Sequence, residues 1–379
     1  MSRRSFLLYG YYGRGNVGDD AMLYGFLHEY ISLFGSANFA VLRGVSSPKI
    51  PAEAVDNVVF VPSVHIEVLR WLVRCSAFLI AGGTHLSDYG QPRRSFAILT
   101  RILLLTSLAK LLRKEVYLLG IGLGPFRTHW GRLLAHIVCL QADGISVRDR
   151  DSVVCGQEMK LGNKMVHAFD MAVLMPLAEK QTLRNKQKVG DILGVSITPV
   201  HSIYFGKPEL DLQMVDKLST ALQHWLDNHP GWRVRLFVFH ADTEHNGNDD
   251  ETITAGLSAM MNDPSAVSIV PYMSDPQEVL AKISECTAFV AMKYHASLLS
   301  YVAELPLLIL AYHPKCESFA NEIGLAKVAV VSLREILDGD AEIRLNMLAA
   351  NPTDFIGTLE FAASRARARL ALAPLNREV

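Results

Sequence analysis

The chain has 379 residues, of which 50% are apolar and 20% charged. This composition excludes a largely disordered chain, and the length predicts two domains. The 37 basic and 38 acidic residues give a net charge of −1, which disfavours a non-specific nucleic-acid binder, because such proteins usually need a basic excess. The five cysteines are widely spaced and form no C-x-x-C pair. The sequence therefore predicts a reduced cytoplasmic protein without a disulfide framework or structural zinc.

Two stretches raise the question of membrane targeting. The charged residues 1–5 resemble the start of a signal peptide, but the apolar run Phe6–Tyr12 is short and ends in a glycine-rich turn, so we predict a first strand. The most apolar stretch, Ile98–Leu112, is interrupted by Arg101 and Lys110 and falls short of the ~20 residues of a membrane span. It predicts a buried helix, and a helix lying in a membrane interface is the alternative.

In the first half of the chain, short apolar runs alternate with helical patterns. Strands separated by helices indicate a parallel sheet with right-handed crossovers. The predicted strands are Phe6–Tyr12, Asn38–Leu42, Ala77–Ala81, Val116–Gly120 and Gly144–Val147, and the predicted helices are Asp19–Phe34, Val64–Arg74, Ser95–Leu112 and Gly131–Ala142.

The composition changes after residue 176. Glu179–Lys188 is polar and basic without apolar periodicity, which predicts a linker over residues 177–190. The strand–helix pattern then restarts. Strands are predicted at Ile192–Ile197, Val234–Phe239, Val267–Ile269, Ala288–Ala291 and Leu307–Ala311, and helices at Leu210–Asn228, Thr252–Met261, Pro276–Ser284, His295–Ala303 and, as a surface helix, Leu359–Ala371.

These elements predict an α/β fold of two Rossmann-like domains with parallel sheets facing a cleft. The expected boundaries are residues 1–176 for the first domain, 191–350 for the second and 351–379 for a C-terminal helical segment. In such sheets, ligands bind outside the carboxyl ends of the strands. The residues that carry chemistry should therefore lie in loops that follow strands.

The loop after the first predicted strand satisfies G-x-G-x-x-G over Gly13–Gly18, the usual dinucleotide fingerprint. Two features disfavour that use. The second strand ends at Leu42–Gly44 rather than at an acid that could hold a ribose. In addition, carboxylates at Asp19 and Asp20 would cap the helix and repel a phosphate. A capped tight turn and a loop lining a polar ligand site remain the two interpretations.

Two further glycine loops follow predicted strands, at Gly82–Thr84 and at Gly120–Gly124. Glycine at a strand exit lets the backbone approach a ligand closely and exposes N–H groups to an anion. Ordinary turns are the alternative for each loop, but three glycine loops in one domain point more strongly to a binding site than any one of them.

Arg148 stands where the fifth strand becomes a loop. A guanidinium there suits bidentate recognition of a phosphate or carboxylate. The alternative is a surface ion pair with Asp149 or Asp151. Asp170 follows another short strand and is a candidate either to orient Arg148 or to contact a sugar hydroxyl.

In the second half, the segment from His240 to Glu251 contains five acids and two histidines. Their spacing matches no strong metal template, so a metal site is the minor alternative. Asp249 and Asp250 are predicted to cap the helix that follows.

Lys293 and His295 follow an apolar strand and open a helix. The positive helix end disfavours the imidazolium form of His295, and such a histidine can exchange a proton near neutral pH. A purely structural histidine is the alternative. Lys315 places a further cation beyond the next strand.

Taken together, these loops resemble the polysaccharide pyruvyl transferase family. The matching stretches occur in the family's order between Phe6 and Lys315: Tyr11–Ala21, Gly82–Gly83 with Asp88, Gly120–Gly122, Ser146–Asp149 with Ser152, Asp170, Met292–Ala296, and Leu305–Pro306 with Tyr312–Lys315. The family usually carries Arg-x-His in the penultimate stretch, whereas this chain has Lys293, which keeps the charge but lacks the bidentate fork.

The resemblance implies a glycosyltransferase-B-like fold and transfer of pyruvate from phosphoenolpyruvate to two sugar hydroxyls, which forms a cyclic ketal and releases phosphate. Phosphoenolpyruvate would be a co-substrate, and neither a cofactor nor a metal is expected, because fixed cations can stabilise the leaving phosphate. The expected general acid is His295, and Asp19 or Asp170 would accept the hydroxyl proton. The expected substrate-binding residues are Arg148, Lys293, Lys315, Asn16, Gly18, Gly82, Gly83, Thr84 and Gly122.

Two alternatives remain at this stage: a nucleotide-sugar glycosyltransferase with the same architecture, and a sugar-binding relative that has lost catalysis. The expected partners are phosphoenolpyruvate and a sugar acceptor, with no nucleic acid. The sequence leaves open whether the acceptor is lipid-linked, whether the cytoplasmic protein contacts the inner face of a membrane, and whether it forms a homo-oligomer.

Overall fold

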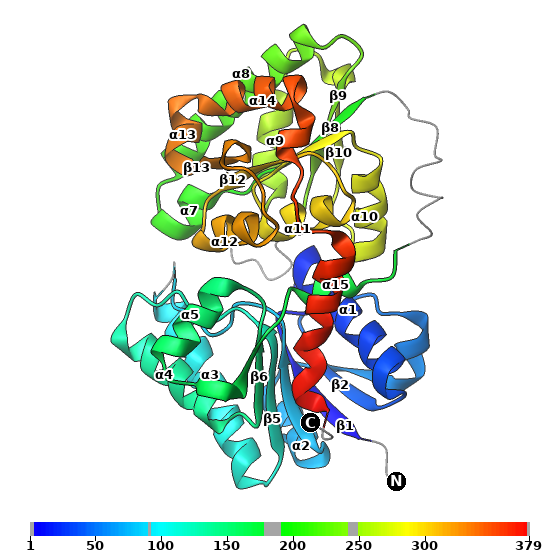
Figure 1. The fold of residues 1–379 in the computed structure, drawn as a ribbon, viewed down its shortest axis with the longest axis vertical. Coiled ribbons are helices and arrows are strands. Elements are labelled where there is room, and N and C mark those ends of the chain that lie inside the picture. Colours follow the sequence, from blue (N-terminus) through cyan, green and yellow to red (C-terminus); the bar gives the residue numbers. More distant parts are fainter. Residues whose placement is uncertain (1–3, 90–91, 178–190, 242–248, 377–379) are drawn as a thin grey trace. The chain divides into compact units, whose positions relative to one another are not determined.

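The structure is a computed structural model that describes residues 4–89, 92–177, 191–241 and 249–376 (Figure 1). It contains two compact units. The first comprises Met1–Arg14, Asp19–Pro176 and Ala362–Val379, and the second comprises Gly15–Gly18 and Leu177–Phe361. Apart from Leu177, the predicted linker lies outside the described residues. The C-terminal segment expected at 351–379 is divided between the units at Phe361, because its last turns bury Leu372 and Leu375 in the first unit.

Within the described ranges, the first unit is built on a parallel sheet with the strand order β3-β2-β1-β4-β5-β6-β7. Leu8 lies opposite Val41 on one side and Leu79 on the other. Central strands of a parallel sheet are covered on both faces and therefore read as continuous apolar runs. The strands are β1 Ser5–Tyr9, β2 Asn38–Arg43, β3 Val58–Pro62, β4 Ala77–Ala81, β5 Glu115–Ile121, β6 Gly144–Val147 and β7 Met165–His167.

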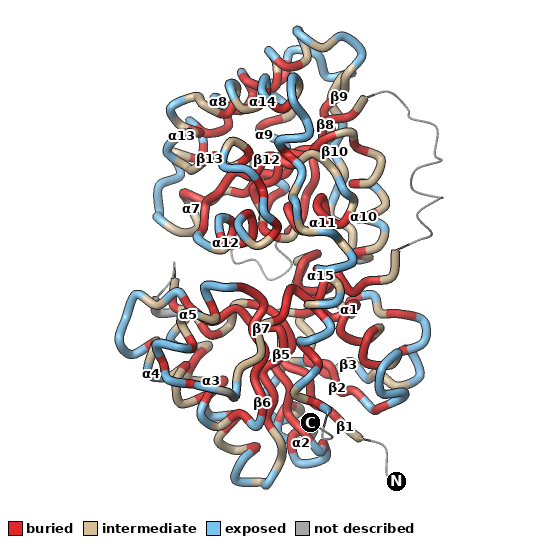
Figure 2. Tube along the Cα trace, in the orientation of Figure 1, coloured by how far each residue is buried: buried red, intermediate tan, exposed pale blue. Residues whose placement is uncertain are grey.

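Alternate residues of β1 show how both faces of this sheet are covered. Leu7 lies in a core cluster with buried residues of α2, α3 and α4, whereas Phe6 packs against Phe39 and against Tyr30 of α1. Figure 2 shows the buried strands running through the middle of the unit. Its helices are α1 Val17–Phe34, α2 His65–Arg74, α3 Pro92–Leu111, α4 His129–Gln141, α5 Arg150–Glu158 and α15 Phe361–Arg369.

The second unit is built on a parallel sheet with the order β10-β9-β8-β11-β12-β13. The order reverses between β8 and β11, which is the point where ligands bind in open α/β sheets. The strands are β8 Ile192–Ser196, β9 Arg233–Phe237, β10 Val267–Val270, β11 Ala288–Ala291, β12 Leu307–Ala311 and β13 Val330–Ser332. The helices are α7 Val200–Phe205, α8 Pro208–Asn228, α9 Glu251–Ala259, α10 Pro276–Ser284, α11 Tyr294–Val302, α12 Pro314–Glu322, α13 Leu333–Asp338 and α14 Asp340–Ala350.

The predicted class of two Rossmann-like α/β domains with parallel sheets is confirmed. All of the apolar stretch Ile98–Leu112 except Leu112 falls in α3, which buries Leu99, Ile102 and Ala109 in the core of the first unit. Among the described residues, no helix combines the length and the apolar character needed to cross a bilayer.

The turn after β1 is held by Asp20, which was predicted to cap α1. Its carboxyl instead accepts a hydrogen bond from the Gly13 N–H at 2.9 Å, while the Gly18 N–H at the start of α1 donates to the Asn16 carboxamide. Gly13 has a φ of +65°, and a Cβ there would lie 2.1 Å from the Ser46 carbonyl oxygen. Asp20 is 1% exposed, and burial raises its pKa to about 8.

We predict that Asp20→Asn stabilises the protein increasingly as the pH rises from about 4 to about 8. Over this window the native state keeps a proton that the unfolded state has released, so the wild-type free energy of unfolding falls. The asparagine cannot ionise, and its advantage should reach the order of a few kcal/mol. Denaturant unfolding at several pH values measures it, with the exposed Asp216→Asn as control. Parallel pH profiles for Asp20→Asn and wild type would contradict the prediction.

Candidate active site

The residues predicted from the sequence fall into one cluster in each unit. In the first unit, Arg148 and Asp170 lie with the glycine loops that follow β4 and β5. Asp19 also belongs to this unit, in the first turn of α1. In the second unit, the predicted residues Asn16, Gly18, Lys293, His295 and Lys315 come together around one pocket. Each cluster is described by itself.

Arg148 is the centre of the first cluster. Its guanidinium lies 2.9 Å from the Asp170 carboxylate and 3.6 Å from that of Asp149, and it donates a hydrogen bond to the Thr84 hydroxyl at 2.9 Å. The side chain of Arg148 is 2% exposed and that of Asp170 is 0% exposed. The pair is therefore buried, which differs from the surface pair with Asp149 or Asp151 that was the alternative for Arg148.

The glycine loops pack closely around this ion pair. Gly122 donates its N–H to the Gly83 carbonyl at 2.9 Å. A Cβ at Gly122 would lie 3.2 Å from Thr84 and 3.4 Å from the Arg148 guanidinium. Gly82 has a φ of +75°, in the region that favours glycine. In this arrangement the glycines make room for the arginine.

His85 follows this loop and was not singled out in the sequence. Burial, reinforced by the positive charge of Arg148, lowers its pKa to about 4. The imidazole is therefore neutral at physiological pH. The sequence gives no signal that the pKa of His85 is lowered, because the positive charge beside it comes from Arg148, 63 positions away.

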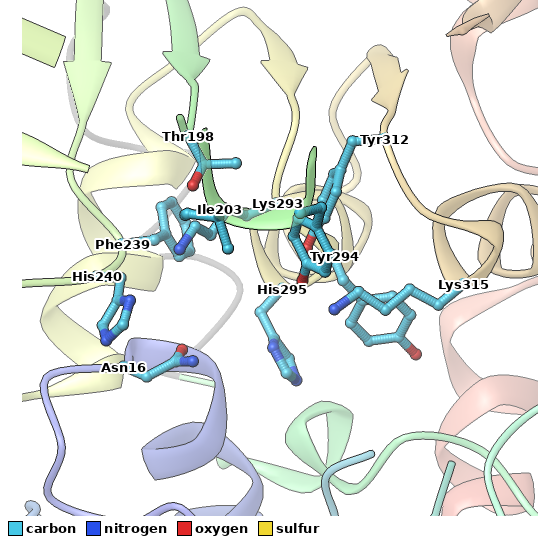
Figure 3. Close-up of a pocket in the computed structure, with 11 residues that line it drawn as sticks. Asn16, Thr198, Ile203, Phe239, His240, Lys293, Tyr294, His295, Tyr312 and Lys315 are labelled. Atoms are coloured by element: carbon cyan, nitrogen blue, oxygen red, sulfur yellow. The ribbon is translucent and has the colours of Figure 1, made fainter. Parts of the chain in front are cut away.

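The second cluster surrounds a pocket of about 110 Å³ (Figure 3). A cavity needs about 10–15 Å³ to hold a single water, so the pocket has room for a small ligand. It lies beyond the carboxyl ends of β8, β9, β11 and β12, at the reversal of strand order. Its lining residues in the described part of the chain all belong to the second unit: Asn16, Thr198, Ile203, Tyr204, Phe239, His240, Lys293, Tyr294, His295, Tyr312 and Lys315.

Residues 15–18 belong to the second unit and form one wall of this pocket, which Asn16 lines. Asn16 and His240 form an antiparallel bridge. On either side of it, the Val17 N–H donates to the Phe239 carbonyl at 3.1 Å, and the Ala241 N–H donates to the Gly15 carbonyl at 2.9 Å. Asn16 of the glycine-rich loop therefore lines the pocket.

His295 lies against Gly18 at this wall. A Cβ at Gly18 would lie 1.9 Å from Nδ1 of the imidazole and 2.2 Å from Cγ, closer than any side chain tolerates. Gly18 is therefore required by the close approach of the ring. The sequence could suggest glycine there, but not which side chain it accommodates.

Lys293 forms an ion pair that the sequence did not predict. Its Nζ lies 3.0 Å from the Asp250 carboxylate, which is 1% exposed and also accepts the His240 N–H at 2.9 Å. Burial raises the pKa of Asp250, while Lys293 opposes that rise. Of the two predicted caps of α9, only Asp249 acts as one: its carboxylate accepts hydrogen bonds from the N–H groups of Glu251 and Thr252. Asp250, which was also predicted to cap the helix, makes no side-chain capping bond among the described residues and instead pairs with Lys293.

The two helices that begin at the pocket, α11 and α12, differ in the capping of their N-termini. At α12, the His313 ring accepts the Lys315 N–H at 3.1 Å, so this helix is capped. At α11, the N-cap residue Lys293 makes no side-chain capping bond within the described part of the chain. The first amides of a helix have no intrahelical acceptor and favour an anion. Lys315, 5.5 Å from the Tyr312 ring centre, lines the same pocket.

No group of three or more His, Cys, Asp or Glu side chains that could hold a metal occurs among the described residues. The loop considered for a metal in the sequence lies largely at residues 242–248, outside the described ranges.

We predict that Arg148→Met lowers the free energy of unfolding by roughly 3–5 kcal/mol, because it leaves the Asp170 carboxylate buried and unpaired. The double variant Arg148→Met/Asp170→Leu should recover part of this loss, because the two residues interact directly. Denaturant unfolding of wild type and the three variants, including Asp170→Leu, gives the coupling energy. Additive effects would contradict the structural role of the pair.

Comparison with known proteins shows that the fold is shared with solved structures. Solved structures of similar fold include a putative UDP-N-acetylglucosamine 2-epimerase from Listeria monocytogenes, with a TM-score of 0.61 and 10% identity over 99% of this chain and 96% of that one. The Neisseria meningitidis UDP-GlcNAc 2-epimerase bound to UDP-GlcNAc has a TM-score of 0.60 and 9% identity over 98% of this chain and 99% of that one. S. aureus MnaA with UDP has a TM-score of 0.59 and 9% identity over 98% of this chain and 94% of that one. Such identities show a shared fold alone, of the glycosyltransferase-B-like kind. The polysaccharide pyruvyl transferase family model matches residues 16–314, so the chain belongs to that family.

Proposed function

We propose that this protein transfers pyruvate from phosphoenolpyruvate to two hydroxyls of a sugar in polysaccharide synthesis, forming a cyclic ketal and releasing phosphate. The observation that carries the proposal is the second-unit pocket, where His295 lies with Lys293 and Lys315 at the start of α11. Family membership supports the same class of transferase.

The charges of the pocket suit a donor that carries both a carboxylate and a phosphate. Lys315 and the first amides of α11 supply positive potential,. Lys293 adds a second ammonium group, but Asp250 balances most of its charge at 3.0 Å. We assign Lys315 and the α11 amides to the phosphate, and Asp250 to positioning Lys293 at the pocket wall.

His295 is the proposed general acid. It would protonate the methylene carbon of phosphoenolpyruvate, so that the double bond becomes a methyl group and the central carbon becomes electron-poor. A sugar hydroxyl then attacks that carbon and loses its proton to a base. The second hydroxyl attacks the same carbon and returns its proton to His295, phosphate leaves with its bonding electron pair and takes up the proton held by the base, and the ring closes. Fixed cations stabilise the charge on the departing phosphate.

The two carboxylates considered as the base differ in their surroundings. Asp170 is 0% exposed, is paired with Arg148, and accepts the Ala172 N–H. We therefore propose that Arg148 and Asp170 position the loops at Gly82–Thr84 and Gly122. Asp19, in the first turn of α1 and 9% exposed, is retained as the proposed base.

Thermal unfolding of the purified protein tests the donor. Phosphoenolpyruvate should raise the melting temperature more than equal concentrations of pyruvate or phosphate, because a ligand that binds only the native state stabilises it. His295→Gln should keep this stabilisation but lose about 10²–10⁴-fold in acceptor-dependent phosphate release. Glycans treated with enzyme and analysed by mass spectrometry identify the ketal.

Three results would count against the proposal. Stabilisation by uridine diphosphate or a uridine diphosphate sugar, with none by phosphoenolpyruvate, would indicate a nucleotide-sugar glycosyltransferase. Wild-type phosphate release by His295→Gln would remove His295 from the role of general acid. Binding of phosphoenolpyruvate without turnover on any acceptor would indicate a relative that has lost catalysis.

A further inference from the structure

The outer sides of α3 and α4 expose large apolar side chains to solvent. Leu104 and Leu111 of α3 are 65% and 79% exposed, and Trp130, Leu133 and Leu140 of α4 are 67%, 45% and 53% exposed. We call these five residues the α3–α4 face. The two helices pack against each other, and Figure 2 shows exposed stretches interspersed with buried ones along both.

The exposed apolar residues of α4 lie along one side of the helix. Trp130, Leu133 and Leu140, with the half-buried Ile137 between them, are spaced by three or four residues, which places them on one side of a helix,. The opposite side buries Ala135, Val138 and Cys139 in the core. A helix of a water-exposed protein normally presents polar residues on its outer side, so α4 carries a second apolar stripe that its own core does not explain.

The same part of the chain has a basic excess, although Lys110 and Arg132 pair with Asp143 and Glu158. Residues 92–142 contain eight Lys or Arg and one Asp or Glu, which leaves 29 basic against 37 acidic residues elsewhere. Arg94 near the start of α3 and Arg113 just after its end are exposed. The net charge of −1 for the whole chain therefore conceals a positively charged segment that coincides with the exposed apolar stripe.

This combination distinguishes between possible occupants. A second copy of the chain related by a two-fold axis would bring the same basic residues against one another, which is unfavourable. An anionic lipid surface instead attracts the basic residues, at roughly 1 kcal/mol for each one near the surface, and accepts apolar side chains into the acyl boundary. Trp130 is of the residue type enriched at membrane–water interfaces.

We propose that the α3–α4 face docks the protein on an anionic lipid bilayer. The helices would lie in the plane of the interface, because their inner sides remain in the protein core. Trp130, Leu133, Leu104 and Leu111 would enter the acyl boundary, and Arg94 and Arg113 would contact lipid phosphates. This proposal rests on the first unit alone and does not depend on the chemistry of the second-unit pocket.

Cosedimentation with vesicles tests the docking. The full chain should bind vesicles of phosphatidylcholine containing about one third phosphatidylglycerol, and not vesicles of phosphatidylcholine alone, and salt should weaken binding. Trp130→Ser/Leu133→Ser should lower the partition coefficient about tenfold or more, because binding scales with buried apolar area. Arg94→Gln/Arg113→Gln should lower it by a similar factor.

Matched controls come from the second unit. Leu212 and Ile343 are 74% and 57% exposed, so Leu212→Ser/Ile343→Ser should bind vesicles like wild type. Arg334, whose side chain is 92% exposed, supplies the charge control Arg334→Gln. Phosphoenolpyruvate stabilisation in solution should be equal in all variants, which separates this test from that of the proposed function.

Three results would overturn the proposal: absence of binding to the anionic vesicles, unchanged binding by both α3–α4 variants, or an equal loss in the controls. Light scattering tests whether a second copy of the chain covers the α3–α4 face instead. A wild-type dimer that becomes a monomer on Trp130→Ser/Leu133→Ser, without vesicle binding by either protein, would assign the face to a second copy of the chain.

Discussion

The second-unit pocket depends on the contact between Gly18 and the His295 ring. The missing side chain lets residues 15–18 lie directly against the imidazole, at a spacing that leaves no room for a Cβ. The same segment is fixed on its other side by backbone hydrogen bonds to Phe239 and Ala241. A protonating group acts only within hydrogen-bond reach of its target, so the backbone that confines the ring also decides whether His295 can do this chemistry.

Charge in both units is arranged as buried pairs rather than as isolated cations. Arg148 pairs with Asp170, and Lys293 pairs with Asp250. A buried pair of this kind contributes little net stability, because desolvation offsets the attraction. Its effect here is geometric: each carboxylate also accepts a backbone N–H, from Ala172 and His240 respectively, which fixes the cation relative to the strand-end loops. The proposed anionic donor would then meet groups that are already oriented.

The sequence predicted the central elements well and the edges poorly. β4, β6, β11, β12 and α10 have the predicted bounds, because buried strands are uniformly apolar runs ended by glycine or polar residues. The missed strands β3 and β13 lie at sheet edges, where they are only partly buried, and the edge strand β7 was expected before Asp170 only as a short strand without bounds. No periodic pattern distinguishes such strands from loops.

The candidate site was predictable where it follows a strand. Lys293, His295 and Lys315 follow the carboxyl ends of β11 and β12 and line one pocket. Asp250 was predicted only as a helix cap and His240 only as a histidine of an acidic loop, because the contacts that they make here are long-range. Arg148 was placed correctly after β6, but its burial against Asp170 follows from packing. Sequence spacing indicates which loops meet, whereas the pairing of charges requires the fold.

The most direct test of this account is the turnover of Gly18→Ala. The added methyl must displace the His295 ring, since its Cβ would lie 1.9 Å from Nδ1, and a misplacement of about 1 Å can cost 10²-fold in rate. At Gly256 in α9, a Cβ would meet no described heavy atom within 4 Å, so Gly256→Ala is the matched control. The account predicts about a hundredfold loss of acceptor-dependent phosphate release for Gly18→Ala, with folding retained by thermal unfolding and with wild-type rates for Gly256→Ala. Equal rates for Gly18→Ala and wild type would contradict it.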